Sequence, residues 1–331
     1  MPSDRAGGEG GLEAAAIEAF TAARRTGWRA RLAEAWASDL AHSFRRNPVA
    51  IVSALIVIVF FAAAALAPWI APTNPYDLRT LSIMDNLLPP VWEEGGDPRF
   101  LLGTDAQGAG VLSGILYGTR ISLIVGFGSV LLSMAIGVSI GIVAGYVGGW
   151  LDSLLMRIAD IQLTFPAILI ALLIGGIAET AVPASERGAL AVPVLIFAIG
   201  ISNWVQYART VRGSTMVVRQ LEYVAAARLI GRSPLAIMAR HILPNIMGPV
   251  LVIATINLAF AIITEATLSF LGVGMPVTEP SLGMLIRDGN DYLFSGEWWL
   301  SVFPSAALVM LALAINLLGD WLRDALNPRL R

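Results

Sequence analysis

Few side chains in this sequence are suited to catalysis. There is no cysteine, which excludes disulfides, thiolate metal sites and thiol nucleophiles together. The two histidines, His42 and His241, lie far apart in the chain, and neither has a second ligand at metal-binding spacing. No serine, histidine and aspartate are arranged as a hydrolytic triad requires. We therefore predict that the chain is not an enzyme and has no catalytic residue, no metal site and no cofactor site.

The sequence also lacks lysine, because all 22 basic residues are arginine. A phosphate-binding P-loop uses a lysine to reach the β- and γ-phosphates of a nucleotide. Without that lysine there is no Walker-type ATPase site, and there is no lysine for a Schiff base either. Any ATP hydrolysis linked to this protein must take place on another chain.

The elements that position the remaining polar residues are apolar enough to lie in a lipid bilayer. Hydrophobic residues make up 56% of the 331 residues and charged residues only 14%, where a soluble domain carries about 25%. A membrane-spanning helix needs about 20 apolar residues. We predict an all-α polytopic membrane protein with six transmembrane helices. These spans cover residues 49–71, 121–146, 161–178, 190–206, 248–271 and 300–318.

The arginines are distributed unevenly between the two sides that these spans define. If the N-terminus lies in the cytoplasm, 17 arginines fall in cytoplasmic segments and five in outside segments. Because arginine and lysine are enriched in cytoplasmic segments, this orientation is favoured over the reverse. We predict a multi-pass protein of the plasma membrane with both termini in the cytoplasm.

The residues before the first span are predicted to form a cytoplasmic arm. Apolar residues are interleaved with arginines from about residue 11 to residue 46, which is typical of a helix at a membrane surface, and a partly disordered arm is the alternative. The apolar run begins too late for a secretory signal. We divide the chain into this arm (1–48), a first transmembrane helix with a periplasmic segment (49–120), and a core with five transmembrane helices (121–331).

Small residues recur every four positions along the second span. Such a stripe lets a second helix approach closely, because van der Waals contact between backbones replaces the hydrophobic drive that lipid cannot supply. We predict helix packing in a bundle or an oligomer through this stripe. Its members are Ser129, Ser133, Gly137, Gly141 and Gly145.

Glu265 is the one formally charged residue inside the six predicted spans. An ionisable group at such a depth can carry a coupling ion, and an ion-coupled secondary transporter is therefore an alternative function. A single acid late in the fifth span is weak support for a proton relay. We predict instead that Glu265 hydrogen-bonds within the bundle or lines an outer gate.

The segment from residue 221 to 245, LEYVAAARLIGRSPLAIMARHILPN, is neither apolar enough for a span nor loop-like. Helix is favoured from Glu222 to Ile230, and Gly231 stands where a helix end needs a left-handed residue. Ser233 and Pro234 form an N-cap and a first turn, and Pro244 is expected to limit the second helix. We predict two short cytoplasmic helices at an angle. The three consecutive alanines shape the first helix to lie in the groove of another protein.

This segment resembles the EAA loop of the permease subunits of ABC importers, in the form found in the dipeptide/oligopeptide branch. Ala226, Ala227, Gly231 and Pro244 stand at the expected spacing, while Ala225 replaces the name-giving glutamate. The stretches FLLGTDAQGAGVLSGILYGTRISLIVG (100–126), EATLSFLGVGMP (265–276) and NLLGDWLRDALNPRLR (316–331) are similar to that branch as well. One departure is that residues 108–110 read Gly-Ala-Gly where the family usually has Gly-Arg-Asp.

The resemblance implies a type I ABC-importer permease-like bundle in a bacterial inner membrane, with a coupling helix that docks on an ATPase. The implied partners are a second homologous permease subunit, two ABC ATPase subunits and a periplasmic or extracellular substrate-binding protein, with no nucleic acid. The residues expected in the coupling element are Glu222, Tyr223, Ala225, Ala226, Ala227, Arg228, Gly231, Arg232, Ser233, Pro234 and Pro244. The implied cargo is di- and oligopeptides, with nickel or saccharides as alternatives within the same architecture.

Overall fold

The fold is described from a computed structural model, which covers residues 39–75, 77, 81–183, 185–276 and 279–326. Most of the predicted N-terminal arm lies outside these residues, and α3 (Asp39–Arg46) is its described part. The chain divides after Ile51 into two compact units. The predictions for the arm and for the division into 1–48, 49–120 and 121–331 stay predictions.

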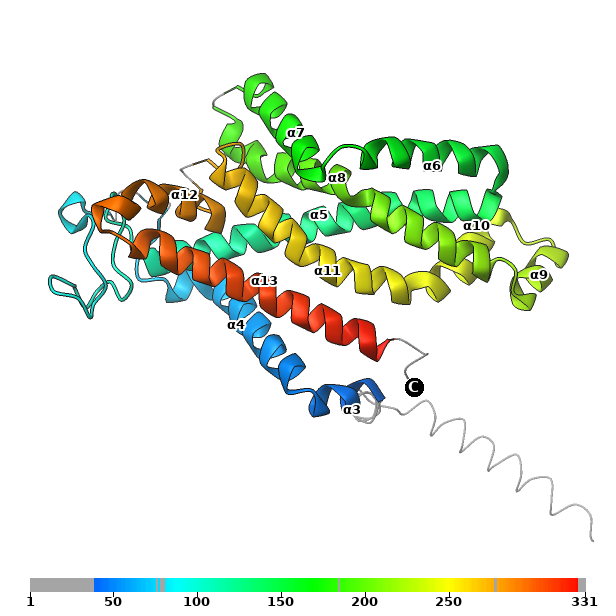
Figure 1. Cartoon of the computed structure of the whole chain (residues 1–331), viewed down its shortest axis with the longest axis horizontal. Coiled ribbons are helices and arrows are strands. Elements are labelled where there is room, and N and C mark those ends of the chain that lie inside the picture. The colour runs from blue at the N-terminus through cyan, green and yellow to red at the C-terminus, as the bar shows by residue number, and fades with distance from the viewer. Residues whose placement is uncertain (1–38, 76, 78–80, 184, 277–278, 327–331) are drawn as a thin grey trace, which may run out of the picture. The chain divides into compact units, whose positions relative to one another are not determined.

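Long apolar helices make up most of the second unit, and the described residues contain no β-strand beyond an isolated bridge between Thr104 and Gly110. Five helical stretches are long and apolar enough to cross a membrane, with the helix that enters α11 counted together with it. Figure 1 shows them as the long helices of the structure. They are α4 (Pro48–Ile70), α5 (Val111–Val147), α8 (Arg187–Val218), α11 (Leu243–Phe270) and α13 (Trp299–Ala325).

The third predicted span, 161–178, is not one continuous helix. It is divided between α6 (Gly149–Leu163) and α7 (Ala167–Ala181), whose axes are bent by 83°. Pro166 lies in the break, and a proline disfavours helical geometry for the residue before it. Within the described part of the chain, the candidate spans therefore number five, or six if this bent pair crosses the membrane as one.

The stripe of small residues on α5 packs along α8. A Cβ on Gly137 would lie 2.4 Å from the backbone oxygen of Trp204, and one on Gly141 would lie 2.6 Å from that of Ala208. The hydroxyl of Ser133 donates to the backbone oxygen of Gly200 at 2.9 Å. Because the partners advance together along both helices, α5 and α8 run parallel. The segment between them must return to the starting end of the bundle, and α6 and α7 take this course along its outside (Figure 1).

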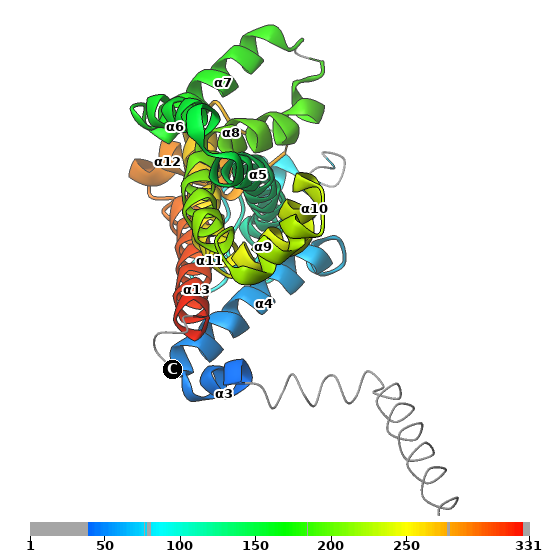
Figure 2. The same ribbon diagram turned by 90° about the vertical axis from the view of Figure 1, so that its right-hand side faces the viewer.

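Other helices complete the apolar core around this pair. The Phe61 ring on α4 contacts the Phe127 ring on α5 edge-on, with 5.4 Å between their centroids. Buried residues of α11 and α13, among them Ile262 and Leu311, belong to the same cluster. Figure 2 shows α5, α8, α11 and α13 gathered side by side. The short helix α12 (Leu282–Tyr292) precedes α13 and packs against it.

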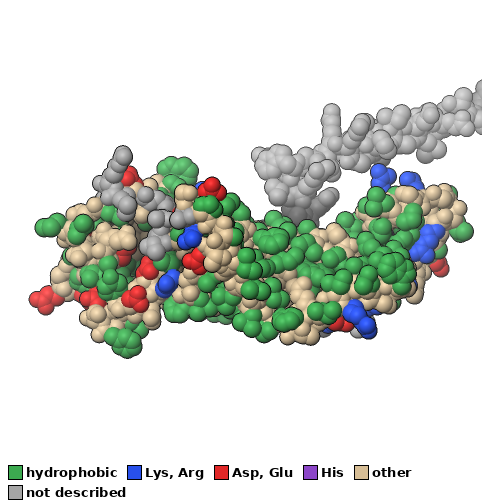
Figure 3. Space-filling model, turned by 90° about the horizontal axis from the view of Figure 1, so that it is seen from above, with side chains coloured by type: hydrophobic (Ala, Val, Ile, Leu, Met, Phe, Trp, Pro, Cys, Tyr) green, Lys and Arg blue, Asp and Glu red, His purple; other side chains and the backbone are tan. Residues whose placement is uncertain are grey.

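The surface of the bundle matches a bilayer in its distribution of charge. Large apolar side chains are exposed along the long helices, for example Leu131, Leu173 and Val309. Figure 3 shows a broad apolar band between the two ends, with acidic side chains concentrated at the end that carries α12 and arginines gathered at the end that carries α9. Exposed apolar surface of this extent has lipid as its natural contact.

Candidate functional site

The segment between α8 and α11 forms two short helices, and we call residues 221–242 the elbow. Helix α9 (Glu222–Leu229) is followed by α10 (Pro234–Ile237), and both lie at one end of the bundle (Figure 1). Gly231 adopts φ of 75°, the left-handed conformation that the sequence indicates at this turn. The Ser233 hydroxyl accepts a hydrogen bond from the backbone N–H of Ala236 at 3.3 Å, as expected for an N-cap.

The elbow has an inner and an outer face. On the inner face, Val224 and Ala227 are buried in a cluster with Ile142 of α5 and with Tyr207 and Val211 of α8. Thus Ala227, the third of the predicted docking alanines, packs within its own chain. This contact fixes the elbow against the bundle and determines which side chains point away.

The outer face of the elbow combines small, apolar and charged residues. Ala225 and Ala226 are exposed, and so are Glu222 and Arg228. The predicted residues Gly231, Arg232, Ser233 and Pro234 are exposed too, and Tyr223 is 41% exposed. Three large apolar side chains that sequence reasoning missed lie here. They are Leu229 (90% exposed), Ile230 (77%) and Leu235 (74%).

Apolar side chains this exposed indicate contact with another surface. Nothing in the sequence distinguishes these apolar residues from those that pack inward, such as Val224 and Ile237. Ala225 and Ala226 make a flat part of this exposed surface, and the three larger side chains project beside it.

The second helix of the elbow does not end at Pro244, contrary to the prediction. Residues 238–242 form a π-helical turn, η2 (Met238–Ile242), and Pro244 lies in the first turn of α11. Because the helix continues across this turn, the local π geometry accommodates the N–H that Pro244 lacks. The wider π turn joins α10 to α11 without a break, so the elbow continues directly into a membrane span.

Glu265 lies fully buried at the junction of three helices. Its carboxylate accepts hydrogen bonds from the hydroxyls of Ser122 on α5, at 2.6 Å, and Ser269 on α11, at 2.8 Å. The N-terminus of α12 is close by, since a Cβ on Gly283 would lie 2.2 Å from the backbone oxygen of Ala266. Glu265 therefore hydrogen-bonds within the bundle, which was one of its two predicted roles, and a role in an outer gate stays a prediction.

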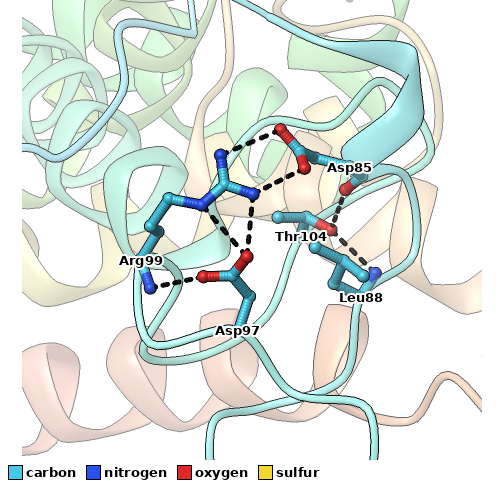
Figure 4. Close-up of polar contacts among 5 residues, drawn as sticks. All are labelled: Asp85, Leu88, Asp97, Arg99 and Thr104. Carbon is cyan, nitrogen blue, oxygen red and sulfur yellow. Dashed lines mark hydrogen bonds and ion pairs between the residues drawn. The ribbon is translucent and has the colours of Figure 1, made fainter.

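The end of the bundle opposite the elbow is covered by the 81–110 loop, which polar contacts hold in shape (Figure 4). Arg99 bridges the carboxylates of Asp85 and Asp97, with 2.7 Å between the closest atoms in each pair. The buried Thr104 hydroxyl accepts from the backbone N–H of Leu88 at 2.8 Å and donates to the backbone oxygen of Asp85 at 2.6 Å. The loop is thus an ordered element and not a linker.

Residues 108–110, where the sequence departs from the family pattern, lie in this loop. One oxygen of the Asp105 carboxylate accepts hydrogen bonds from the backbone N–H groups of Gln107 and Ala109, each at 2.8 Å. Burial raises the pKa of Asp105, against the opposing effect of these backbone donors. The turn is therefore closed by an aspartate and backbone amides, without the arginine and aspartate of the family pattern.

A cavity of about 260 Å³ opens beside this turn. Its walls include Asp105 and Ala109 from the loop and Asp288 and Asp291 from α12. Partial loss of solvent and the negative charges of Asp105 and Asp291 raise the pKa of Asp288, while Arg287 opposes the shift. Among the described residues, no group of three or more histidine, cysteine or acidic side chains has metal-binding geometry.

Two family profiles match the sequence of this chain. The sequence profile of the family described as binding-protein-dependent transport system inner membrane component matches residues 137–331. The profile of the N-terminal TM domain of oligopeptide transport permease C matches residues 34–90.

Individual proteins match over most of the chain. A dipeptide transport system permease protein of Haemophilus influenzae is 37% identical over 87% of this chain and 93% of its own length. A putative peptide transport system permease protein of Brucella suis is 41% identical over 84% of this chain and 86% of its own. A glutathione transport system permease protein of Pectobacterium atrosepticum is 38% identical over 93% of each.

One solved structure is similar in fold. It shows the MetNI methionine ABC transporter in inward-facing conformations, with a TM-score of 0.50 and 19% sequence identity. The similarity covers 65% of this chain and 96% of the matched chain. At this identity the likeness concerns the arrangement of helices alone.

Proposed function

Since the chain belongs to the family of binding-protein-dependent transport system inner membrane components, we propose that it is the permease subunit of an ATP-driven importer of short peptides. The cargo is inferred from the relatives, which are named for dipeptide, peptide and glutathione transport. The partners are a second permease of the same family, two ATPase subunits and a substrate-binding protein.

The outer face of the elbow is the observation that carries this proposal. It offers Ala225 and Ala226 as a flat contact, with Leu229 and Ile230 projecting beside them. The chain has no lysine with which to bind nucleotide phosphates itself. A permease driven by separate ATPase subunits needs such a contact surface and needs no ATPase site of its own.

The charge at the elbow end supports the proposed orientation. The elbow end carries an excess of arginines, including Arg228, Arg232 and Arg240, and therefore faces the cytoplasm. The 81–110 loop and α12 then face outward, where the binding protein delivers cargo. In this arrangement both chain termini lie in the cytoplasm of the bacterial cell.

Transport follows from alternating access. ATP binding draws the two ATPases together, and the elbow moves with the ATPase on which it is docked. The parallel pair of α5 and α8 moves as one body, because its backbones touch along the small-residue stripe and cannot slide past each other without steric clashes. The assembly then opens alternately to the outside and to the cytoplasm, between discrete packings of the spans.

Cross-linking tests the docking site directly, because the chain has no cysteine of its own. The variant Ala226→Cys places a thiol on the exposed face of the elbow, and Ala106→Cys places one in the exposed part of the 81–110 loop as the matched control. In membranes that contain the whole assembly, a bifunctional thiol reagent should join Ala226→Cys to an ATPase and should leave Ala106→Cys unjoined to it. Cross-linking of both variants or of neither would contradict the proposed docking site.

A further inference from the structure

The guanidinium of Arg219 contacts the end of a different helix from its own. Arg219 follows the last residue of α8, and its Nη1 donates to the backbone oxygen of Gly145 at 2.8 Å and to that of Tyr146 at 3.1 Å. Both oxygens belong to the last turn of α5, which ends at Val147. The final carbonyl groups of a helix have no partner within it and carry its negative dipole charge, so a cation there is well placed.

A second arginine reaches the same turn from the other side of the junction between α8 and α9. The Cζ atom of Arg228, in the last turn of α9, lies 5.1 Å from the centre of the Tyr146 ring. This distance is within the range of a cation–π contact. The junction is thus attached to the end of α5 at two points, by two hydrogen bonds from one nitrogen of Arg219 and by the ring contact of Arg228.

Glycines allow the end of α5 to come this close. A Cβ on Gly145 would lie 2.8 Å from the backbone oxygen of Arg212, so the last turn of α5 touches the backbone of α8. Gly148, which ends α5 with φ of 71°, would place a Cβ 3.3 Å from Nη1 of Arg219. A larger residue at Gly148 would push the guanidinium away from the carbonyl oxygens, and one at Gly145 would push the end of α5 away from α8.

The chain enters the elbow from α8 through Arg219 and leaves it through the π turn of η2 into α11. The elbow also packs against α5 and α8 through Val224 and Ala227. Arg219, at the entry, adds the polar contact that holds this end of the elbow to the last turn of α5. Since α5 also touches α8 along its length, a displacement that reaches α5 is passed to the whole parallel pair.

We propose that Arg219 is a positioning residue that transmits the movement of the elbow to α5, and that transport is uncoupled from ATP hydrolysis without it. The inference rests on the proposed function and adds to it the contact through which movement of the ATPases reaches α5. Arg228 supports the contact from α9. Loss of Arg219 leaves the outer face of the elbow intact, so the ATPases still dock.

The test compares Arg219→Ala, Arg219→Gln and Arg219→Lys with a matched control, Arg157→Ala, which removes an exposed arginine of α6. The four variants are purified as whole assemblies with both ATPases and reconstituted in liposomes with the binding protein. Three quantities are measured: the amount of ATPase bound, the basal rate of ATP hydrolysis, and the peptide taken up per ATP hydrolysed.

We expect Arg219→Ala to bind the ATPases and hydrolyse ATP at the basal rate, with uptake per ATP reduced by about tenfold. Arg219→Lys, whose ammonium can still donate to both oxygens, should retain most of the coupling, and Arg219→Gln should be intermediate. Arg157→Ala should match the unaltered protein. A residue needed only for folding would lower the amount of ATPase bound and the rate of hydrolysis together with the amount of assembled protein, and would leave the uptake per ATP unchanged.

Equal uptake per ATP in the unaltered protein and in every variant that assembles would overturn the proposal. If Arg219→Ala fails to assemble, the glutamine and lysine variants decide the question by the same comparison. Failure of the proposed function would look different, because then the unaltered protein itself would bind no ATPase.

Discussion

Glu265 on α11 accepts a 2.6 Å hydrogen bond from Ser122 on α5, although 143 residues separate them in the chain. The carboxylate is fully buried and accepts from Ser269 as well. Two spans that are distant in sequence are thus joined at the end of the bundle that carries α12. A buried polar network of this kind stabilises one arrangement of the helices only if its members are satisfied.

The substitution Glu265→Ala should therefore lower the stability of the bundle by about 2–4 kcal/mol, because it leaves a cavity and removes both hydrogen bonds. Glu265→Gln keeps one acceptor oxygen and should cost less than half as much. Thermal unfolding in detergent measures both effects. Glu94→Gln, at an exposed position of the 81–110 loop, is the control and should unfold as the unaltered protein does. Equal unfolding temperatures for the alanine variant and the control would contradict a stabilising role for Glu265.

The contact between α5 and α8 leaves no room for a methyl group at Gly141. A Cβ there would lie 2.6 Å from a backbone oxygen, so Gly141→Ala must push the two helices apart. We expect a loss of about 1–3 kcal/mol in the free energy of unfolding, measured by denaturation in mixed micelles. Gly213→Ala is the matched control on α8, because no atom lies within 4 Å of its Cβ position. It should gain up to about 1 kcal/mol from helix propensity. If Gly213→Ala lowers the free energy of unfolding and Gly141→Ala leaves it unchanged, α5 and α8 do not meet at Gly141.

The turn of the elbow depends on the left-handed conformation of Gly231. Gly231→Val meets no neighbour within 4 Å but must adopt φ near 75°, which costs about 1–2 kcal/mol for a side chain with a Cβ. The strain should tilt Leu229 and Ile230 away from the ATPase, and hydrolysis should lose its dependence on loaded binding protein. Gly231→Asn, which tolerates this conformation better, should retain that dependence. Stimulated hydrolysis that is unaltered in the valine variant would contradict this function of the turn.

The raised pKa of Asp105 makes the stability of the 81–110 loop sensitive to pH. The folded protein holds the Asp105 proton more tightly than the unfolded chain does, since burial raises this pKa from 3.8. The contribution to stability is fully present below pH 3.8 and is lost as the pH rises through the folded-state value. Asp105→Asn removes the charge and keeps an oxygen for the amides of Gln107 and Ala109.

The asparagine variant should therefore unfold at a higher temperature than the unaltered protein at pH 8, and the two should converge near pH 4. Tryptophan fluorescence during heating reports the transition. Trp299 is a suitable reporter because its ring N–H donates to the backbone oxygen of Thr104, beside the turn. If the unaltered protein gains stability over the variant as the pH rises, the pKa of Asp105 is shifted in the other direction.

Local features of the fold could be predicted from the sequence because local forces decide them. The left-handed Gly231 and the Ser233 cap depend on one turn of chain, and the helices at the predicted spans depend on runs of apolar residues. The ends of those helices were less predictable. Helix α5 begins ten residues before its predicted span, since hydropathy marks the part in lipid and a helix continues past it.

Features that depend on tertiary packing were missed. Nothing near Glu265 in the sequence identifies Ser122 as its partner, and Ala225 and Ala227 look alike although only the second is buried. The contact of Arg219 was missed for the same reason, because its partners, Gly145 and Tyr146, lie far from it in the sequence, at the end of α5. The bend between α6 and α7 could have been predicted from Pro166. Pro244 gives the same indication of a helix end, but there the helix continues through the π turn into α11.

Reconstituted transport tests the central claim, that a motor on other chains drives this permease through the elbow. Labelled dipeptide uptake is measured in liposomes that hold the two permeases with or without the ATPases, in the presence of binding protein and either ATP or an imposed ion gradient. Uptake against a concentration gradient should require the ATPases and ATP together and should not respond to the ion gradient. Uphill uptake driven by the ion gradient in the absence of the ATPases would contradict the account.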